Sequence, residues 1–223
     1  MSDRRSVNHG SVRPASLATP AGGDGCQWIL ASSSPRRRAL LRLLGHPFRV
    51  IVPAIDETPQ AGERPAAFAR RAAMEKALAV AERLPPLRGA RWRIVIACDT
   101  IVVLGHRILG KPRDAEDARR MLRALSGRTH AVLSGLCVRW ESATGRPRQE
   151  VRVVKTAVEF RDLSAEEIER YVATGEPLDK AGAYAIQGRA AAMVRAIRGS
   201  WTNVVGLPLA ELADVLARLQ GRR

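Results

Sequence analysis

The segment at residues 32–37 (SSSPRR) combines three hydroxyl side chains with two arginines, a set suited to binding phosphate oxygens. Ser34 is a favourable N-cap and Pro35 a favourable first helical residue, and a helical pattern follows. Since a helix N-terminus offers unpaired N–H groups and a partial positive charge, the segment is predicted to bind an anion. The alternative is an ordinary Ser-Pro cap followed by a basic surface.

Three carboxylates stand where they could hold a divalent cation. Asp99 interrupts the apolar run at residues 93–104, and Asp56 and Glu57 lie in a loop after a predicted strand. An unpaired carboxylate is costly to bury, so Asp99 is expected at a strand end that faces a cleft. Two or three converging carboxylates would hold Mg²⁺, which prefers oxygen ligands and keeps several waters. The alternatives are a solvated loop for Asp56 and Glu57 and a structural cap for Asp99.

Two of the four lysines stand in positions that suggest contact with an anion. Lys76 shares a helical face with small apolar residues, so it either extends to solvent or reaches into a cleft. Lys111 ends the segment GHRILGK, a near match to a Walker A loop. Because Pro112 stands where that loop needs Ser or Thr to bind Mg²⁺, the pattern disfavours an ATPase. Lys111 remains a candidate for contact with phosphate.

The segment at residues 179–188 (DKAGAYAIQG) places small residues around Tyr184 and Gln187. Small residues allow the backbone to approach a ligand or a facing element closely. The Gln187 amide carries an acceptor and a donor, so it can complement the O4 and N3–H edge of uracil or thymine. Together with the groups above, this segment predicts a Mg²⁺-dependent phosphate site with one amide that reads a base.

Helices and strands alternate along the chain and would position these groups. Strands are predicted at 27–31, 48–52, 93–104 (interrupted at 98–100), 129–140 and 149–160, the last two as a hairpin. Helices are predicted at 35–44, 65–84, 114–125, 164–175 and 208–219, and residues 164–167 (SAEE) form a capping box at the start of the fourth. We therefore expect an α/β fold with a mixed sheet, in one domain over residues 26–223. Residues 1–25, rich in Ser, Gly, Pro and Ala, are expected to form a disordered extension.

Composition restricts the class of protein. The formal net charge of +15 suggests polyanionic partners. Most of the cations are arginines scattered along the whole chain, however, and the alternative is that they form a solvated basic surface. No apolar run is long enough to cross a bilayer, and no secretory signal is evident. The three cysteines form no CxxC pair, which excludes a disulfide framework and a Cys-rich zinc site. We therefore expect a cytoplasmic protein with no membrane partner.

A non-catalytic module that binds RNA or DNA is the alternative from another functional class. The basic composition favours it, but only nine Phe, Trp and Tyr residues are available for stacking on bases. Such a module would lose affinity steeply with salt. We expect no stable complex with nucleic acid.

Seven motifs occur in the order found in the Maf family of nucleoside triphosphate pyrophosphatases, which the chain resembles from Trp28 to Leu219. They are SSSPRR (32–37), IDET (55–58), CDTIV (98–102), GKPR (110–113), LSGRTH (125–130), DKAGAY (179–184) and VVGLPL (204–209). The resemblance implies a Maf/ITPase-like fold, with helices flanking a mixed sheet, two lobes around a cleft, and a homodimer. The branch it resembles acts on dTTP and UTP, releasing pyrophosphate by metal-assisted attack of water on the α-phosphate.

The same resemblance implies roles for individual residues. Asp99 is implied as the proton acceptor and, with Glu57, as a ligand of Mg²⁺ or Mn²⁺. Arg36, Thr100 and Gln187 fall where this branch has its specificity residues. The implied phosphate-binding residues are Ser32, Arg37, Lys76 and Lys111. The alternative substrate is another, modified or methylated nucleotide, because a sister branch that acts on 7-methyl-GTP typically has Glu in place of Gln187.

Overall fold

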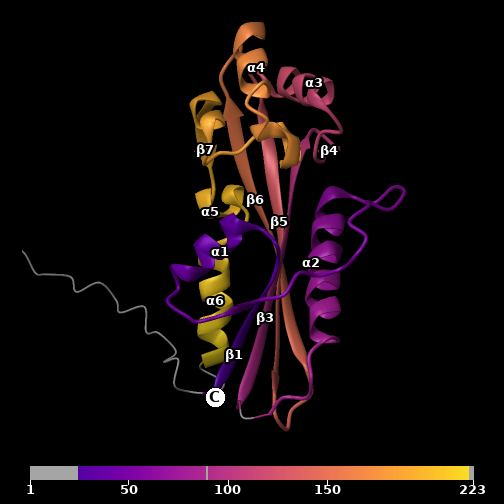
Figure 1. The fold of residues 1–223 in the computed structure, drawn as a ribbon, viewed down its shortest axis with the longest axis vertical. Coiled ribbons are helices and arrows are strands. Elements are labelled where there is room, and N and C mark those ends of the chain that lie inside the picture. Colours follow the sequence, from indigo (N-terminus) through magenta and orange to yellow (C-terminus); the bar gives the residue numbers. More distant parts are fainter. Residues whose placement is uncertain (1–24, 89, 221–223) are drawn as a thin grey trace, which may run out of the picture.

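The computed structural model describes residues 25–88 and 90–220, which fold around a mixed seven-stranded sheet (Figure 1). The strand order is β2-β1-β3-β5-β6-β7, and β4 also pairs with β3. Strand β1 pairs in parallel with β2 and β3, and the other pairs are antiparallel. The strands are β1 (Cys26–Ala31), β2 (Arg49–Val50), β3 (Trp92–Leu104), β4 (Arg107–Leu109), β5 (Thr129–Ser142), β6 (Arg148–Phe160) and β7 (Val194–Arg198). The expected α/β fold with a mixed sheet is confirmed.

Helices cover both faces of the sheet and one of its ends (Figure 1). The α-helices are α1 (Pro35–Arg42), α2 (Pro65–Ala81), α3 (Ala115–Leu125), α4 (Ala165–Val172), α5 (Trp201–Val205) and α6 (Leu209–Gln220). Three short 3₁₀ helices are η1 (Glu176–Asp179), η2 (Ala181–Ala183) and η3 (Arg189–Met193). Within residues 25–88 and 90–220, no helix is both long and apolar enough to cross a membrane. Apart from Gly25, the predicted extension at residues 1–25 lies outside the described residues.

Strand β1 is buried on both faces, which explains why its sequence shows no alternation of polar and apolar residues. Trp28 and Leu30 pack with residues of α1 and α6, whereas Ile29 and Ala31 pack with alanines of α2. Helix α2 therefore lies on one face of the sheet and α1 and α6 on the other (Figure 1).

A second packing region lies at the other end of the sheet, where α3 and α4 cover β5 and β6 (Figure 1). The capping box predicted at residues 164–167 is present, because Ser164 accepts from the Glu167 N–H and Glu167 accepts from the Ser164 N–H. The long strands β3, β5 and β6 run through both packing regions. They provide a continuous support for groups that come from two parts of the molecule.

The predicted interruption of the strand at residues 98–100 is wrong. Strand β3 is continuous, and Asp99 pairs with Gly135 of β5 in the middle of the strand, not at a strand end. Side chains alternate along a strand, so Asp99 lies on the face covered by α2 and Thr100 on the opposite face. The carboxylate is tolerated inside the strand because a lysine of α2 pairs with it.

The edge of β3 that faces β1 is open over a short stretch. Strand β1 pairs with β3 up to Ala97, and β4 pairs with it from Val102 onward. Among the described residues, no strand pairs with residues 98–101 on that side. At about 3.3 Å per residue, the opening is about 13 Å long. Side chains from both faces of β3 can reach the same space through this opening.

Candidate active site

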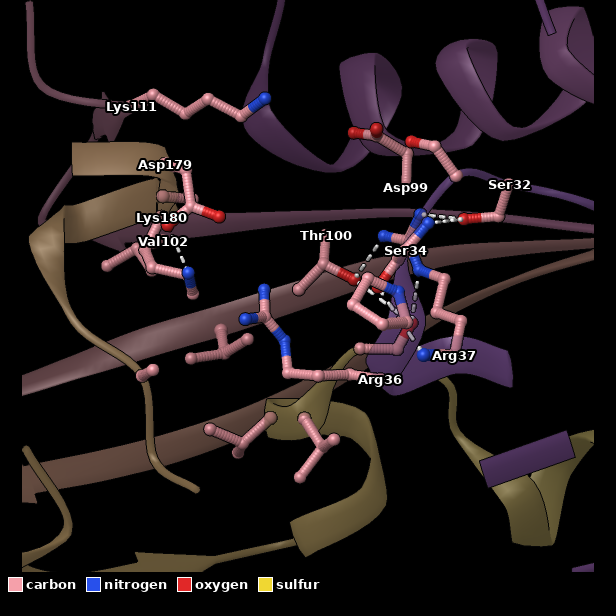
Figure 2. A pocket seen from close by; sticks show the side chains of 18 of the residues that line it. Ser32, Ser34, Arg36, Arg37, Asp99, Thr100, Val102, Lys111, Asp179 and Lys180 are labelled. Carbon is pink, nitrogen blue, oxygen red and sulfur yellow. Dashed lines mark hydrogen bonds and ion pairs between the residues drawn. The ribbon is translucent and has the colours of Figure 1, made fainter. Parts of the chain in front are cut away.

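A cleft of about 510 Å³ lies at the open edge of β3 (Figure 2). Its walls come from the loop after β1, the start of α1, the centre of β3 and the segment at residues 179–187. The residues to which the resemblance assigns roles all line it. They are Ser32, Arg36, Arg37, Glu57, Lys76, Asp99, Thr100, Lys111 and Gln187. Distant parts of the chain thus meet at one place, and the individual roles of these residues remain predictions.

The loop after β1 is ordered by its own hydroxyl groups. The Ser34 side chain caps α1 by accepting from the Arg37 backbone N–H at 3.4 Å. The Ser32 Oγ accepts from the Ser34 backbone N–H at 3.1 Å, and Ser32 is buried. The predicted cap is therefore present. It fixes the start of α1, with Arg36 and Arg37 in its first turn, beside the cleft.

The Arg37 guanidinium is held by three separate parts of the chain. It donates from Nε to Gly206 O at 2.8 Å, from Nη1 to Ser32 Oγ at 3.3 Å and from Nη2 to Thr100 Oγ1 at 3.2 Å. Thr100 Oγ1 also shares a hydrogen bond of 2.8 Å with Ser134 Oγ, which is fully buried. A cation fixed in this way can meet an anion with little reorganisation.

Arg36 extends in a different direction, toward the opposite wall of the cleft that carries Asp179 and Lys180 (Figure 2). Burial lowers the pKa of Arg36, and the charges of Asp179 and Glu176 act in the opposite direction. Arg36 and Arg37 therefore present positive charge to two different regions of the cleft.

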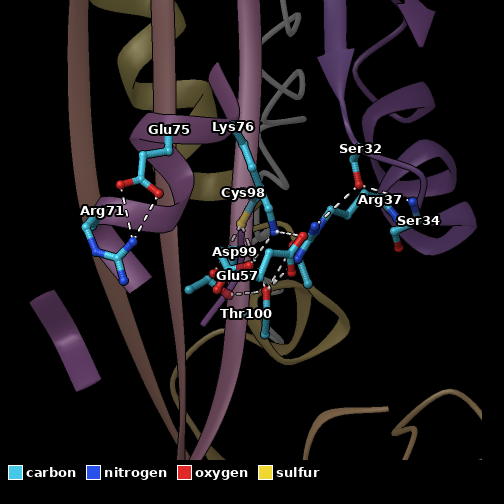
Figure 3. A network of polar contacts seen from close by, with 12 residues as sticks. Ser32, Ser34, Arg37, Glu57, Arg71, Glu75, Lys76, Cys98, Asp99 and Thr100 are labelled. Atoms are coloured by element: carbon cyan, nitrogen blue, oxygen red, sulfur yellow. Dashed lines mark hydrogen bonds and ion pairs between the residues drawn. The ribbon is translucent and has the colours of Figure 1, made fainter. Parts of the chain in front are cut away.

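Lys76, Asp99 and Glu57 form a charged cluster at the α2 side of the cleft (Figure 3). Lys76 Nζ lies 2.5 Å from Asp99 Oδ1 and 3.0 Å from Glu57 Oε1. Lys76 and Asp99 are only 5% and 6% exposed, whereas the Glu57 side chain is 56% exposed. Burying a charge is costly unless it is paired, so the two buried groups depend on each other. Of the two alternatives considered for Lys76, the structure shows the one in which it reaches the cleft.

The protein supplies two carboxylate ligands for a Mg²⁺-like cation at this cluster. The remaining ligands would be phosphate oxygens of the substrate and water molecules. Two carboxylates, from Asp99 and Glu57, meet at a single ammonium group. Among the described residues, no group of three or more His, Cys, Asp or Glu side chains could hold a metal alone. Protein-bound Mg²⁺ usually has one or two carboxylates together with phosphates and waters, so two carboxylates are sufficient.

Asp56, the third carboxylate considered, takes no part in the cleft lining. It is exposed, and its Oδ1 accepts from the Thr58 backbone N–H at 2.9 Å. Hydrogen bonds from Thr58 lower the pKa of Asp56. Asp56 therefore behaves as a residue of a solvated loop, which was the alternative interpretation.

The opposite wall of the cleft adds charged residues that the sequence did not single out as site residues. Lys180, whose side chain is 11% exposed, pairs with Asp179, and both residues line the cleft. This pair lowers the pKa of Asp179. Lys111 and Gln187 lie on the same side of the cleft and are exposed. The segment at residues 179–188 was predicted to approach a ligand through its small residues and Gln187, but no separate signal distinguished Asp179 and Lys180.

Tyr184 lines the cleft and is supported from behind by buried rings. Its Oη lies 2.8 Å from His130 Nε2, and its ring packs edge-on against His130 and Phe160. Burial lowers the pKa of His130 to about 4, so the imidazole is neutral near pH 7. His130 is therefore a structural partner of Tyr184 and adds no positive charge to the cleft.

Positive charge predominates among the ionisable residues of the cleft. Five cations line it, against three carboxylates. The cations are Arg36, Arg37, Lys76, Lys111 and Lys180, and the carboxylates are Glu57, Asp99 and Asp179. An excess of cations on both walls of a concave site attracts a strongly anionic ligand.

Comparison with known proteins identifies the family of this chain. The profile of the family described as Maf-like protein matches residues 27–219. The chain is 50% identical over 190 residues to the dTTP/UTP pyrophosphatase of Pelotomaculum thermopropionicum, covering 85% of this chain and 95% of that protein. It is 54% identical to the dTTP/UTP pyrophosphatase of an Anaeromyxobacter species, covering 85% and 88% of the two chains. A HAM1 protein from Coxiella burnetii aligns with a TM-score of 0.41, at 18% identity over 86% of this chain and 99% of that chain. The predicted resemblance is confirmed, and the chain belongs to the Maf family.

Proposed function

We propose that this protein hydrolyses dTTP and UTP to the nucleoside monophosphate and pyrophosphate, the activity named for its relatives. One observation carries the proposal: the buried carboxylate of Asp99 lines the same cleft as cations from α1, α2 and the opposite wall. A triphosphate is a strongly anionic ligand, so it would be drawn into this cleft and held beside a carboxylate that can accept a proton.

Asp99 would act as the proton acceptor. A water molecule attacks the α-phosphorus, and its proton passes to the Asp99 carboxylate. The new bond joins the water oxygen to the α-phosphorus, while the bond from that phosphorus to the bridging oxygen of the β-phosphate breaks. The electron pair of the broken bond leaves with pyrophosphate. Lys76, at 2.5 Å, holds the Asp99 carboxylate in one orientation throughout the reaction.

The cations would position the triphosphate and stabilise the charge that it carries in the transition state. Arg37 is already held by Ser32, Thr100 and Gly206, so little of its motion remains to be lost when substrate binds. Lys111 would contact the phosphates from the opposite wall. In phosphoryl transfer, positioning and electrostatic stabilisation supply most of the acceleration.

Asp99 and Glu57 would also hold a divalent cation, Mg²⁺ or Mn²⁺, together with phosphate oxygens. When bound, such an ion neutralises phosphate charge and polarises the phosphorus–oxygen bonds. Lys76 contacts both carboxylates, so it keeps them close to each other before substrate arrives. Asp99 is fixed by burial, whereas the exposed Glu57 side chain is freer to adjust.

Selectivity for the base would come from Arg36, Thr100 and Gln187. The Gln187 amide is suited to uracil and thymine, because it can donate to O4 and accept from N3–H. Thr100 acts through its hydrogen bond to Arg37, which couples the specificity residues to the phosphate end of the cleft. Arg36 extends toward Asp179 and Lys180 (Figure 2), which belong to the same cleft-lining segment as Gln187.

The experiment that tests the function is release of pyrophosphate with Mg²⁺ across a panel of canonical and modified nucleoside triphosphates. We expect dTTP and UTP to be preferred, and Asp99→Asn to reduce turnover by about 10²- to 10⁴-fold, the usual contribution of a general base. Thermal unfolding of the variant checks that the fold is retained. Wild-type turnover in Asp99→Asn, or no release from dTTP and UTP by the wild-type protein, would refute the proposal.

The base-reading role of Gln187 is tested separately. A carboxylate cannot donate a hydrogen bond to O4, so Gln187→Glu is expected to lower kcat/KM for uracil and thymine nucleotides. The measurement is the ratio of kcat/KM for UTP to kcat/KM for CTP. An unchanged ratio would remove Gln187 from base recognition.

A further inference from the structure

The loop at residues 185–189, which carries Gln187, is held by two side chains that do not line the cleft. Tyr171 is near the end of α4, and Glu176 begins η1. The loop therefore depends on contacts outside the substrate site for its position.

Two hydrogen bonds fix the loop on either side of Gln187. The Ala185 backbone N–H donates to Tyr171 Oη at 3.3 Å, and the Arg189 backbone N–H donates to Glu176 Oε2 at 3.2 Å. Tyr171 Oη in turn donates to Glu176 Oε1 at 2.9 Å. Both carboxylate oxygens are used, so one phenol and one carboxylate form a continuous clasp from Ala185 to Arg189.

The loop backbone also lies directly against the Glu176 carboxylate. A Cβ at Gly188 would lie only 2.2 Å from Glu176 Oε1 and 2.5 Å from its Cδ. Glycine is therefore required at position 188 for the loop to lie this close to the carboxylate. Within the loop, the Gly188 N–H donates to Ala185 O at 2.9 Å, which closes a tight turn around Gln187.

We infer that Tyr171 and Glu176 are positioning residues that set nucleobase selectivity by fixing the backbone around Gln187. The inference rests on the proposed function and on the base-reading role of Gln187. The exposed Gln187 side chain gains its direction from the turn on which it stands. An error of about 1 Å in the position of a recognition group can cost about a hundredfold in rate, so a loosened loop would lose selectivity.

Glu176→Met and Tyr171→Phe test the inference with substitutions of similar size. Glu176→Met removes both carboxylate oxygens, so the hydrogen bonds to Tyr171 Oη and to the Arg189 N–H are both lost. Tyr171→Phe removes the acceptor for Ala185. We expect kcat/KM for UTP to fall about tenfold or more in each variant, while kcat/KM for CTP changes by less than about twofold.

Gly188→Ala breaks the same clasp from the side of the loop, because its methyl group would displace the Glu176 carboxylate. We expect the same loss of UTP selectivity, and a Gly188→Ala/Glu176→Met double variant no less selective than either single variant. Glu169→Gln is the matched control: the exposed Glu169 lies on α4 and pairs with half-buried Arg119, and neither residue lines the cleft. We expect it to keep the wild-type ratio. A parallel loss for UTP and CTP in the clasp variants would indicate a merely structural role and overturn the inference.

Hydrogen–deuterium exchange provides a readout that does not depend on catalysis. In Glu176→Met, the amides of residues 185–189 should exchange faster than in the wild-type protein, while those of α4 stay protected. Unchanged protection of the loop would overturn the inference even if the enzyme is active on dTTP and UTP. If the wild-type protein released no pyrophosphate from dTTP and UTP, the proposed function would be refuted. The exchange result would still decide whether the clasp holds the loop.

Discussion

Replacing Lys76 by methionine removes one charge from a buried pair and leaves the other. Methionine fills similar space but cannot pair with Asp99, which is 6% exposed. Among the described residues, Lys76 is the one cation within ion-pair distance of the Asp99 carboxylate. The Lys76→Met variant would therefore contain a buried and uncompensated negative charge.

The expected cost follows from that geometry. Removing one partner of a buried ion pair typically destabilises a protein by about 3–5 kcal/mol. With a urea m-value of about 1–3 kcal/mol per molar, the unfolding midpoint should fall by about 1 M or more. Pyrophosphate release should also fall, because the Asp99 carboxylate loses the group that orients it.

A double-mutant cycle separates the pair from the side chains themselves. Lys76→Met/Asp99→Asn contains neither buried charge, so it should be more stable than Lys76→Met alone. We expect the two substitutions to be non-additive by about 2–3 kcal/mol in the free energy of unfolding. The assay is urea unfolding followed by circular dichroism for the four proteins of the cycle.

Glu75→Gln on the same helix is the matched control. Glu75 pairs with Arg71 at 3.1 Å, but its side chain is 41% exposed. Such an exposed pair contributes about 0.5 kcal/mol, so this variant should unfold close to the wild-type midpoint. A Lys76→Met variant as stable as Glu75→Gln, or an additive cycle, would refute the reasoning that Asp99 depends on Lys76.

Two further predictions concern the packing around the site. Gly135→Ala would place a Cβ 1.9 Å from Ala69 O, so α2 must move away from the sheet; we expect a loss of about 1–3 kcal/mol in urea unfolding, together with lower pyrophosphate release. Gly110→Ala, where a Cβ would meet nothing within 4 Å, is the control for stability, and equal midpoints for the two variants would contradict the prediction. Burial lowers the pKa of His130 to about 4, below the value of about 6.5 in the unfolded chain, so the unfolded state binds more protons between these values. The wild-type protein should therefore lose about 3 kcal/mol from this residue as the pH falls from 7 to 4, and His130→Gln, whose amide can still form a hydrogen bond with Tyr184, should lack that part of the pH dependence. Parallel pH profiles of urea unfolding for the two proteins would show that His130 is not responsible.

Local sequence was sufficient to predict where α1 begins. Ser34 and Pro35 determine a helix start through contacts that span three residues, and those contacts are present in the structure. The same applies to the capping box at residues 164–167. Hydrogen bonds of this range depend on residue type and spacing alone, so they can be predicted without knowledge of the fold.

Asp99 shows where such reasoning fails. A carboxylate inside an apolar run correctly indicated that Asp99 faces a cleft. The cost of burying a carboxylate, however, led to the wrong prediction that Asp99 lies at the end of a strand. The structure keeps it in the middle of β3, because Lys76, 23 residues earlier, supplies the compensating charge. The partner lies on a helix that packs against β3, and no local pattern specifies which residue of that helix faces Asp99.

The sequence by itself determines which residue types are available to bind phosphate, a cation and a base, and most of the helices and strands that carry them. Their arrangement in one cleft depends on contacts across long separations, such as Arg37 with Gly206, 169 residues apart. The opening at residues 98–101 exists because β1 ends where it does and β4 begins further along β3. The clasp of Tyr171 and Glu176 on the Gln187 loop likewise depends on tertiary contacts between α4, η1 and residues 185–189. Helix caps and strand periodicity act over a few residues, whereas strand order and the packing of helices on a sheet determine which distant side chains meet.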